Sequence, residues 1–178
     1  MPDIDATPAL KLIASRLKTL TAMLDKAEGL WGGRDLDMLA VARIAPDMHP
    51  LAWQVAATAT QSELFLGWCR GEERPNTVSA PSSWSEARAL LSKALADVED
   101  GAASSLVMPE TRHIRLEAIG MCLDLSGPRY LDDWILPNLY FHLITTYAIM
   151  RMQGMEFGKA DFMAHIAGDI RPIAPLPA

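Results

Sequence analysis

The sequence is poor in the residues that carry reactive chemistry. It has only two cysteines and four histidines, and an excess of acidic over basic residues gives a net charge of −6. Cys69 and Cys122 form no motif with each other, so neither a disulfide framework nor a zinc finger is expected. A glycine-rich phosphate loop and a nucleophile elbow are also missing. The sequence therefore offers no ready-made catalytic motif.

The acidic balance limits the expected partners. Affinity for nucleic acids depends on clustered Lys and Arg, and binding to anionic membranes needs basic runs of the same kind. The sequence has neither. Its first ten residues, MPDIDATPAL, contain no basic region before an apolar core, which predicts a cytoplasmic protein without a secretory signal. The partners that we expect are a small molecule and a second copy of the chain, in a homodimer.

Long apolar runs are also scarce. The longest stretch without a charged residue extends from Trp134 to Met150, and Pro137, Asn138 and His142 interrupt it. A membrane span needs roughly 17–25 apolar residues, and each polar group inside it would need a partner. A helix that is apolar on nearly every side is typical of a bundle core. We therefore predict a buried helix and no transmembrane segment.

Hydrophobic periodicity predicts four long helices. Thr7 is the expected N-cap of the first, Asp47 of the second, and Ser83 with Glu86 forms a capping box at the third. The expected ranges are 7–29, 47–71, 83–101 and 128–154. No internal repeat is present. The predicted fold class is all-α, a four-helix bundle.

Smaller elements are expected between these helices. Asp35 or Asp37 is placed to cap a short helix that ends at Ala42. Between residues 112 and 126 the apolar period changes to two on both sides of a turn at 119–120, which predicts a β-hairpin before the last long helix. Residues 1–163 are expected to form one domain, with a last helical turn near 158–163. Residues 164–178 are a proline-rich C-terminal tail, and its last stretch, IRPIAPLPA over 170–178, is expected to be unstructured.

Polar side chains gather on one face of the last long helix. At 100° per residue, Asn138, His142, Thr145 and Thr146 point to the same side. One interpretation is a satisfied structural network, in which Asn138 and His142 bond to helix carbonyls, water or Gln54. The other is a small polar ligand pocket in the bundle core, lined by Asn138, His142, Thr145, Thr146 and Gln54. The sequence leaves both open.

Two stretches, PDMHPLAWQV and LPNLYFHLITTYAIMRMQGMEFGKADF, carry a family resemblance. They resemble an uncharacterised bacterial branch of the DinB/YfiT-like superfamily, catalogued as a domain of unknown function. The resemblance extends from the first helix to Phe162. It implies a four-helix bundle, in agreement with the periodicity, and a homodimer.

The resemblance also implies a position for a metal. DinB-like proteins commonly hold a divalent ion with one histidine in the second helix and an HxxxH pair early in the last. His142 matches the second histidine of that pair, but Asn138 stands at the first position. Residues 52–60, where the other ligand would lie, contain no histidine. We therefore predict a DinB-like protein without a bound metal or other cofactor.

An alternative keeps the metal on a rebuilt site. His49, His142 and Asp47 would then hold an ion such as Zn or Ni. The resemblance implies for this case a thiol-dependent transferase or isomerase activity. His165 lies beyond the resemblance and receives no role. Whether the chain is an enzyme is left open.

Overall fold

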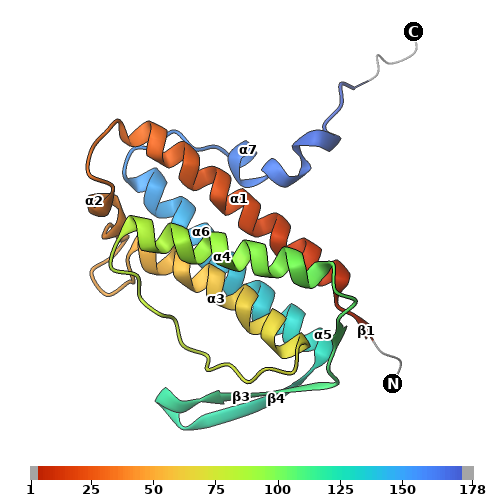
Figure 1. Cartoon of the computed structure of the whole chain (residues 1–178). Coiled ribbons are helices and arrows are strands. Elements are labelled where there is room, and N and C mark those ends of the chain that lie inside the picture. The colour runs from red at the N-terminus through yellow and green to blue at the C-terminus, as the bar shows by residue number, and fades with distance from the viewer. Residues whose placement is uncertain (1–3, 174–178) are drawn as a thin grey trace.

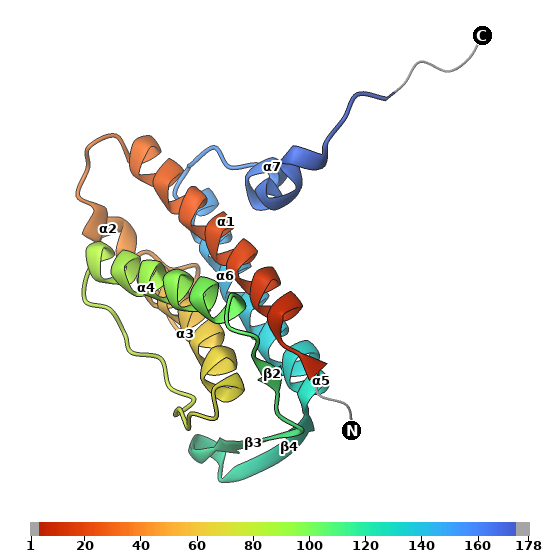
Figure 2. The same ribbon diagram turned by 45° about the vertical axis from the view of Figure 1, so that its right-hand side comes forward.

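Four long helices lie side by side in the computed structural model, which describes residues 4–173 apart from the side chain of Ala118 (Figure 1). They are α1 (Thr7–Trp31), α3 (Leu51–Cys69), α4 (Trp84–Ala102) and α6 (Leu136–Met152). α3 packs against both α4 and α6, and α1 packs against α4. α1 and α6 run in one direction and α3 and α4 in the other, so the loop over 70–83 returns the chain along the bundle (Figures 1 and 2). The predicted four-helix bundle is confirmed.

The smaller elements are strands, short helices and turns. The β-elements are β1 (Ile4–Asp5), β2 (Val107–Met108), β3 (Thr111–Leu116) and β4 (Met121–Ser126). The short helical elements are α2 (Leu36–Ala40), η1 (Glu117–Ile119), α5 (Gly127–Arg129), η2 (Tyr130–Ile135), α7 (Lys159–Phe162) and η3 (Ala164–Asp169). Among the described residues, no helix is both long enough and apolar enough to cross a membrane.

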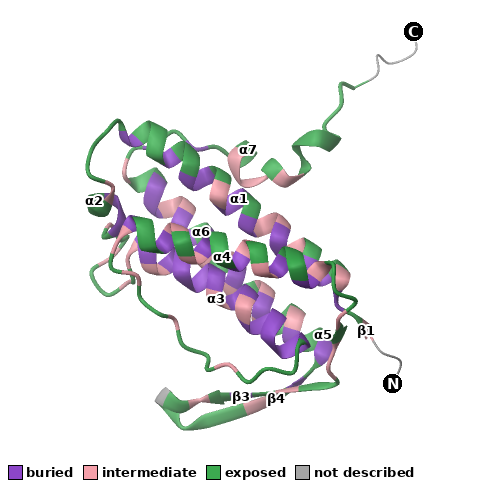
Figure 3. Cartoon of the chain, in the orientation of Figure 1, coloured by how far each residue is buried: buried purple, intermediate pink, exposed green. Residues whose placement is uncertain are grey.

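The core follows the apolar stripe of α1. Five residues three or four apart have at most 1% of their surface exposed: Leu10, Ile13, Leu17, Leu20 and Leu24. α3 is buried on nearly every side, because α4 and α6 cover it on two flanks (Figure 3). Burial of these side chains supplies the main stabilisation of the bundle.

The predicted hairpin is present as β3 and β4. The strands pair in antiparallel register from Thr111 opposite Ser126 to Leu116 opposite Met121. Gly120 closes the turn with φ 64°, a left-handed conformation that glycine adopts without strain. Trp68, at the end of α3, donates from Nε1 to the Thr111 carbonyl at 3.4 Å. The hairpin is therefore attached to the bundle at its base.

Two predicted helix caps are wrong. Thr7 is the first residue of α1 rather than its cap, and the Asp5 carboxylate accepts from the Thr7 amide at 2.8 Å. α3 begins at Leu51, so Asp47 lies in the preceding turn. The Leu51 amide donates to the Ala42 carbonyl at 2.8 Å, a contact from the end of the short helix α2. In both cases a segment outside the helix fixes its first residue.

Two other predicted caps are correct. Asp35 caps α2 by accepting from the Asp37 amide at 2.9 Å. Ser83 caps α4 by accepting from the Glu86 amide at 3.1 Å. The Glu86 carboxylate completes the arrangement with Ser82 rather than with Ser83 itself.

The last long helix contains a π-helical turn. α5, η2 and α6 follow one another without a break, and η2 is π-helical. Pro137 lacks an N–H and lies in the first turn of α6, and the backbone just before it, near Asp133 and Trp134, is irregular. Asn138 donates from Nδ2 to the Trp134 carbonyl at 2.7 Å. This side chain supplies a donor for a carbonyl at the irregularity.

The C-terminal segment packs on the outside of the bundle. α7 forms the predicted last turn, and Lys26 of α1 bonds to Asp161 at 2.7 Å. Residues 164–169, at the start of the tail, form the 3₁₀ helix η3 against α1. Residues 174–178 of the predicted tail lie outside the described range.

Candidate functional site

The clearest polar contact in the bundle core joins α3 to α6. His142 Nδ1 lies 2.8 Å from Gln54 Oε1. Gln54 is only 2% exposed, and its Nε2 donates to the carbonyl of His49 at 3.1 Å. That second bond orients the amide, so that its oxygen points to the imidazole. Two of the predicted site residues are therefore in direct contact.

The contact with Gln54 determines which ring nitrogen of His142 carries the hydrogen, and burial keeps the ring neutral. An amide oxygen only accepts, so Nδ1 must carry the hydrogen. Burial, followed by the positive charge of His49 when that ring is protonated, lowers the pKa of His142 from 6.5 to about 4. The ring is neutral at pH 7, and its Nε2 presents a lone pair. Among the described residues Nε2 has no hydrogen-bond partner, and the His142 side chain is only partly buried.

Aromatic rings border this imidazole. Trp53 meets it edge-on with ring centroids 5.4 Å apart, and Phe141 does the same at 5.2 Å. His49 stacks on the indole of Trp53 at 3.8 Å with the planes 13° apart. The first turn of α3 and the middle of α6 thus place two aromatic rings against one imidazole. Sequence reasoning missed Trp53 and Phe141 as parts of this site.

The remaining residues of the polar stripe bond within their own helix. Thr145 donates to the Phe141 carbonyl at 2.7 Å, and Thr146 donates to the His142 carbonyl at 3.0 Å. Asn138 bonds to the Trp134 carbonyl rather than to Gln54. The structure therefore brings His142 and Gln54 together, and Asn138, Thr145 and Thr146 bond to helix carbonyls. Bonds of these kinds belong to the interpretation as a structural network.

α3 carries its own row of buried polar side chains, which the sequence analysis did not identify. Gln54, Thr58 and Gln61 are spaced four and three residues apart and are all nearly fully buried. Thr58 donates to the Gln54 carbonyl at 2.9 Å, whereas Gln61 Oε1 is buried without a partner. A buried acceptor of this kind calls for water or a ligand donor. The helical spacing of the three polar residues was visible in the sequence.

These residues do not fit the metal site of the superfamily. His142 Nδ1 is already engaged by Gln54, and Asn138 is bonded to its own helix. Asp47 and His49 are both exposed, Asp47 in the turn before α3. Among the described residues, no three His, Cys, Asp or Glu side chains come together in a way that could hold a metal ion. The rebuilt set of His49, His142 and Asp47 is not assembled.

Neither cysteine has the surroundings of a nucleophile. Cys69 is buried, and this burial raises the pKa of its thiol to about 12. Cys122 is exposed on β4. Among the described residues, neither thiol forms a hydrogen bond to a base.

Comparisons with known proteins agree with this architecture. The fold is similar to a crystal structure of a DinB family member protein from Shewanella denitrificans, with a TM-score of 0.68 and 26% sequence identity. The match covers 93% of each chain. A family model described as "Domain of unknown function (DUF1993)" matches residues 8–163. No curated protein matches this chain.

Proposed function

Because the chain belongs to the DUF1993 family of unknown function, we propose its function from the geometry of the Gln54–His142 site. The protein is a DinB-like helical bundle, and we infer that it binds a small polar ligand at that site without a divalent metal. One observation carries this proposal. A neutral imidazole is held through Nδ1 by Gln54, which leaves its Nε2 acceptor without a partner among the described residues, beside two aromatic rings.

The geometry defines the kind of ligand. Nε2 accepts a hydrogen bond, so the ligand carries an O–H or N–H donor. The rings of Trp53 and Phe141 beside His142 favour a flat apolar body, since aromatic pairs gain energy in edge-to-face or offset contact. In this proposal, Asn138, Thr145 and Thr146 keep the α6 backbone satisfied behind the site. They act as a wall of the pocket rather than as direct ligand contacts.

Ligand-observed NMR with indole and phenol as probes tests the proposal. Saturation transfer from the protein to both probes is expected for the native chain. His142→Phe keeps the volume of the ring and removes the acceptor, so the transfer should be lost. His113→Phe, on the exposed hairpin, is the matched control and should keep it. Equal transfer in the His142→Phe variant would refute the proposal.

The proposed site functions without a metal. The ligands of the superfamily site are not assembled around His142, and a single imidazole does not retain a divalent ion against water. Elemental analysis of protein purified without a histidine tag should therefore find no stoichiometric Zn or Ni. One ion per chain would revive the transferase or isomerase alternative.

We also propose that the chain is a cytoplasmic homodimer, joined through α6. Three large apolar side chains on that helix are exposed: Phe141 at 59%, Ile144 at 49% and Met152 at 49%. Their spacing places them on one side of α6. An apolar helix face of this kind is typical of a protein–protein contact. A partner on this face would also cover the ring of Phe141 that borders His142.

A further inference from the structure

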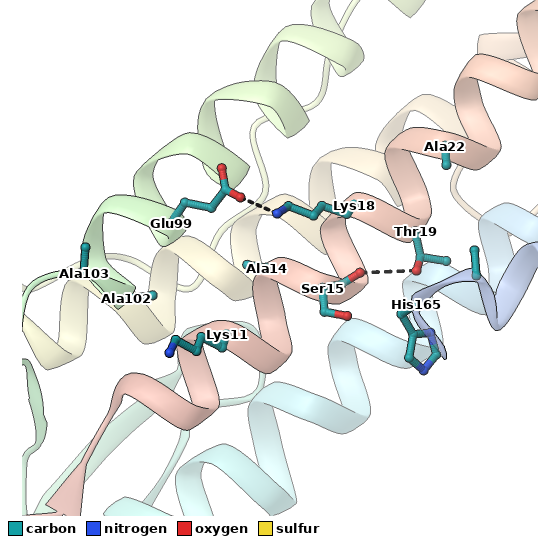
Figure 4. A pocket seen from close by; sticks show the side chains of 11 residues that line it. Lys11, Ala14, Ser15, Lys18, Thr19, Ala22, Glu99, Ala102, Ala103 and His165 are labelled. Atoms are coloured by element: carbon teal, nitrogen blue, oxygen red, sulfur yellow. Dashed lines mark hydrogen bonds and ion pairs between the residues drawn. The ribbon is translucent and has the colours of Figure 1, made fainter. Parts of the chain in front are cut away.

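A cavity lies on the α1–α4 side of the bundle, away from the Gln54–His142 contact between α3 and α6. It has a volume of about 870 Å³ and is formed by α1, the C-terminal end of α4 and η3 (Figure 4). Small-molecule sites typically measure roughly 300–1,000 Å³. None of its lining residues belongs to the Gln54–His142 site. The cavity is therefore independent of the function proposed above.

Small side chains create this space. α1 contributes Ala14 and Ala22, and the end of α4 contributes Ala102 and Ala103. Ala164 of η3 closes the third side. Methyl groups line the cavity where longer side chains would fill it, so the walls are apolar and short. They suit the apolar body of a ligand.

The charged groups of the cavity are unbalanced. From Thr7 to Leu24, α1 has three basic residues and no acidic one. Glu99 is the one acid among the lining residues, and it pairs with Lys18 at 2.6 Å (Figure 4). Lys11 makes no ion pair in the described part of the chain, and the acid on which its charge acts, Asp5, is not a lining residue. One positive charge is therefore left at the cavity of an otherwise acidic protein.

Hydrogen-bond donors lie on the same face of α1. Ser15 is one helical turn after Lys11, and its Oγ accepts from Arg16 Nη1 at 3.1 Å. Because that contact uses a lone pair, the Ser15 hydroxyl hydrogen is left to donate. His165 also lines the cavity, and its Nδ1 is buried without a partner. A buried unpartnered nitrogen calls for a ligand or a water.

We propose that this cavity binds an amphipathic anion, a carboxylate or a phosphate monoester on a short apolar body. The anionic group lies against Lys11 and Ser15, and the apolar body lies over the alanine walls. A charge-assisted hydrogen bond from Lys11 supplies the main polar recognition. His165 contributes an imidazole nitrogen at the η3 side of the cavity.

Isothermal titration calorimetry with octanoate and octyl phosphate tests this. Both probes should saturate the native chain at one site. Lys11→Gln should weaken both about tenfold, the loss of one charge-assisted hydrogen bond. Ala22→Leu places a larger side chain in the cavity from an exposed helix position and should abolish binding. Lys93→Gln, on α4 away from the cavity, is the charge-matched control and should leave binding unchanged.

The two probes also distinguish the two ligand chemistries. Tighter binding of octyl phosphate assigns a phosphate monoester, and tighter binding of octanoate assigns a carboxylate. Three results would overturn the proposal. The first is the absence of saturable binding. The second is an equal loss of affinity in the Lys93→Gln and Lys11→Gln variants. The third is an affinity for neutral 1-octanol equal to that for octanoate.

Discussion

His142 is held by one hydrogen bond to a neighbouring helix, and this predicts how much stability the protein loses when the side chain is removed. His142→Ala should lower the free energy of unfolding by about 1–2 kcal/mol, because water can enter where the ring leaves and reach Gln54. A double-mutant cycle with Gln54→Ala should give a coupling of about 1 kcal/mol. Asn138→Ala should be additive with His142→Ala, because Asn138 bonds to the Trp134 carbonyl. Urea denaturation measures all of these values.

A coupling energy between Asn138 and His142 as large as that between Gln54 and His142 would contradict the separate roles given to these two side chains. It would mean that the two side chains share a partner. A loss of about 3 kcal/mol or more for His142→Ala alone would show that water does not enter and that Gln54 is left stranded.

The lowered pKa of His142 predicts a dependence of stability on pH. Above pH 6.5 the ring is neutral in both the folded and the unfolded chain. Between pH 6.5 and about 4, the unfolded chain binds a proton at this position and the folded chain does not. The free energy of unfolding should therefore fall as the pH falls through this window. The contribution is about 2 kcal/mol once the solvent-open part of the ring is considered.

His142→Phe isolates this contribution. Other titrating groups affect the native chain and the variant alike, so their effects cancel in the difference. Urea unfolding at pH 7 and at pH 4 should show a smaller loss in the variant than in the native chain. Equal losses would mean that the pKa of His142 is not lowered.

Part of the site could be predicted at the level of single residues. Helical spacing placed His142 in the core, and the amide of Gln54 was one of the partners considered. The tautomer of His142 was not predictable, because the carbonyl of His49 fixes the Gln54 amide through a turn before α3. Phe141 was missed because its ring is exposed and borders the imidazole only through its position beside His142 in α6.

Helix packing in α4 requires a glycine at one position. A Cβ at Gly101 would collide with the buried Leu66 of α3, whereas a Cβ at Gly29 of α1 would meet open space. Gly101→Ala should therefore destabilise the protein by about 1 kcal/mol, because the clash outweighs the gain in helix propensity. Gly29→Ala should stabilise it by about 0.5–1 kcal/mol. Thermal unfolding of the two variants compares them directly.

Opposite signs for these two substitutions are the expected signature of close contact between α3 and α4. Stabilisation by both would show that Leu66 moves aside at no cost. Destabilisation by both would instead mean that Gly29 has a backbone role of its own at the end of α1.

The long helices were predictable because their period is local. Leu10, Leu17 and Leu24 define the buried face of α1 within the helix itself. The ends of α1 and α3 and the strand β1 were not predictable in the same way. β1 has two residues and pairs with β2 about a hundred positions later, so no local hydrophobic periodicity predicts it. η3 forms against α1, and its own sequence has no strong helical pattern.

At the scale of the whole molecule, the exposed face of α6 predicts the association state. Phe141→Glu places a charge in the centre of the proposed dimer contact and should produce a monomer. Met38→Glu, on α2, adds the same charge at another exposed apolar position and should leave the dimer intact. Light scattering at tens of micromolar distinguishes the two states. A native chain that is monomeric under these conditions would refute the dimer.

The number of residues in the π-helical turn η2 sets the rotation of α6 about its own axis. An α-helix turns by about 100° per residue, so one residue removed from 130–135 would rotate the rest of α6 by that angle. Tyr130 is held in place by Trp68 and Phe65, so the rotation would turn His142 away from Gln54. The loop over 70–83 joins helices without setting their phase, and it tolerates shortening better. Insertions and deletions among relatives should therefore be common in that loop and absent from 130–135.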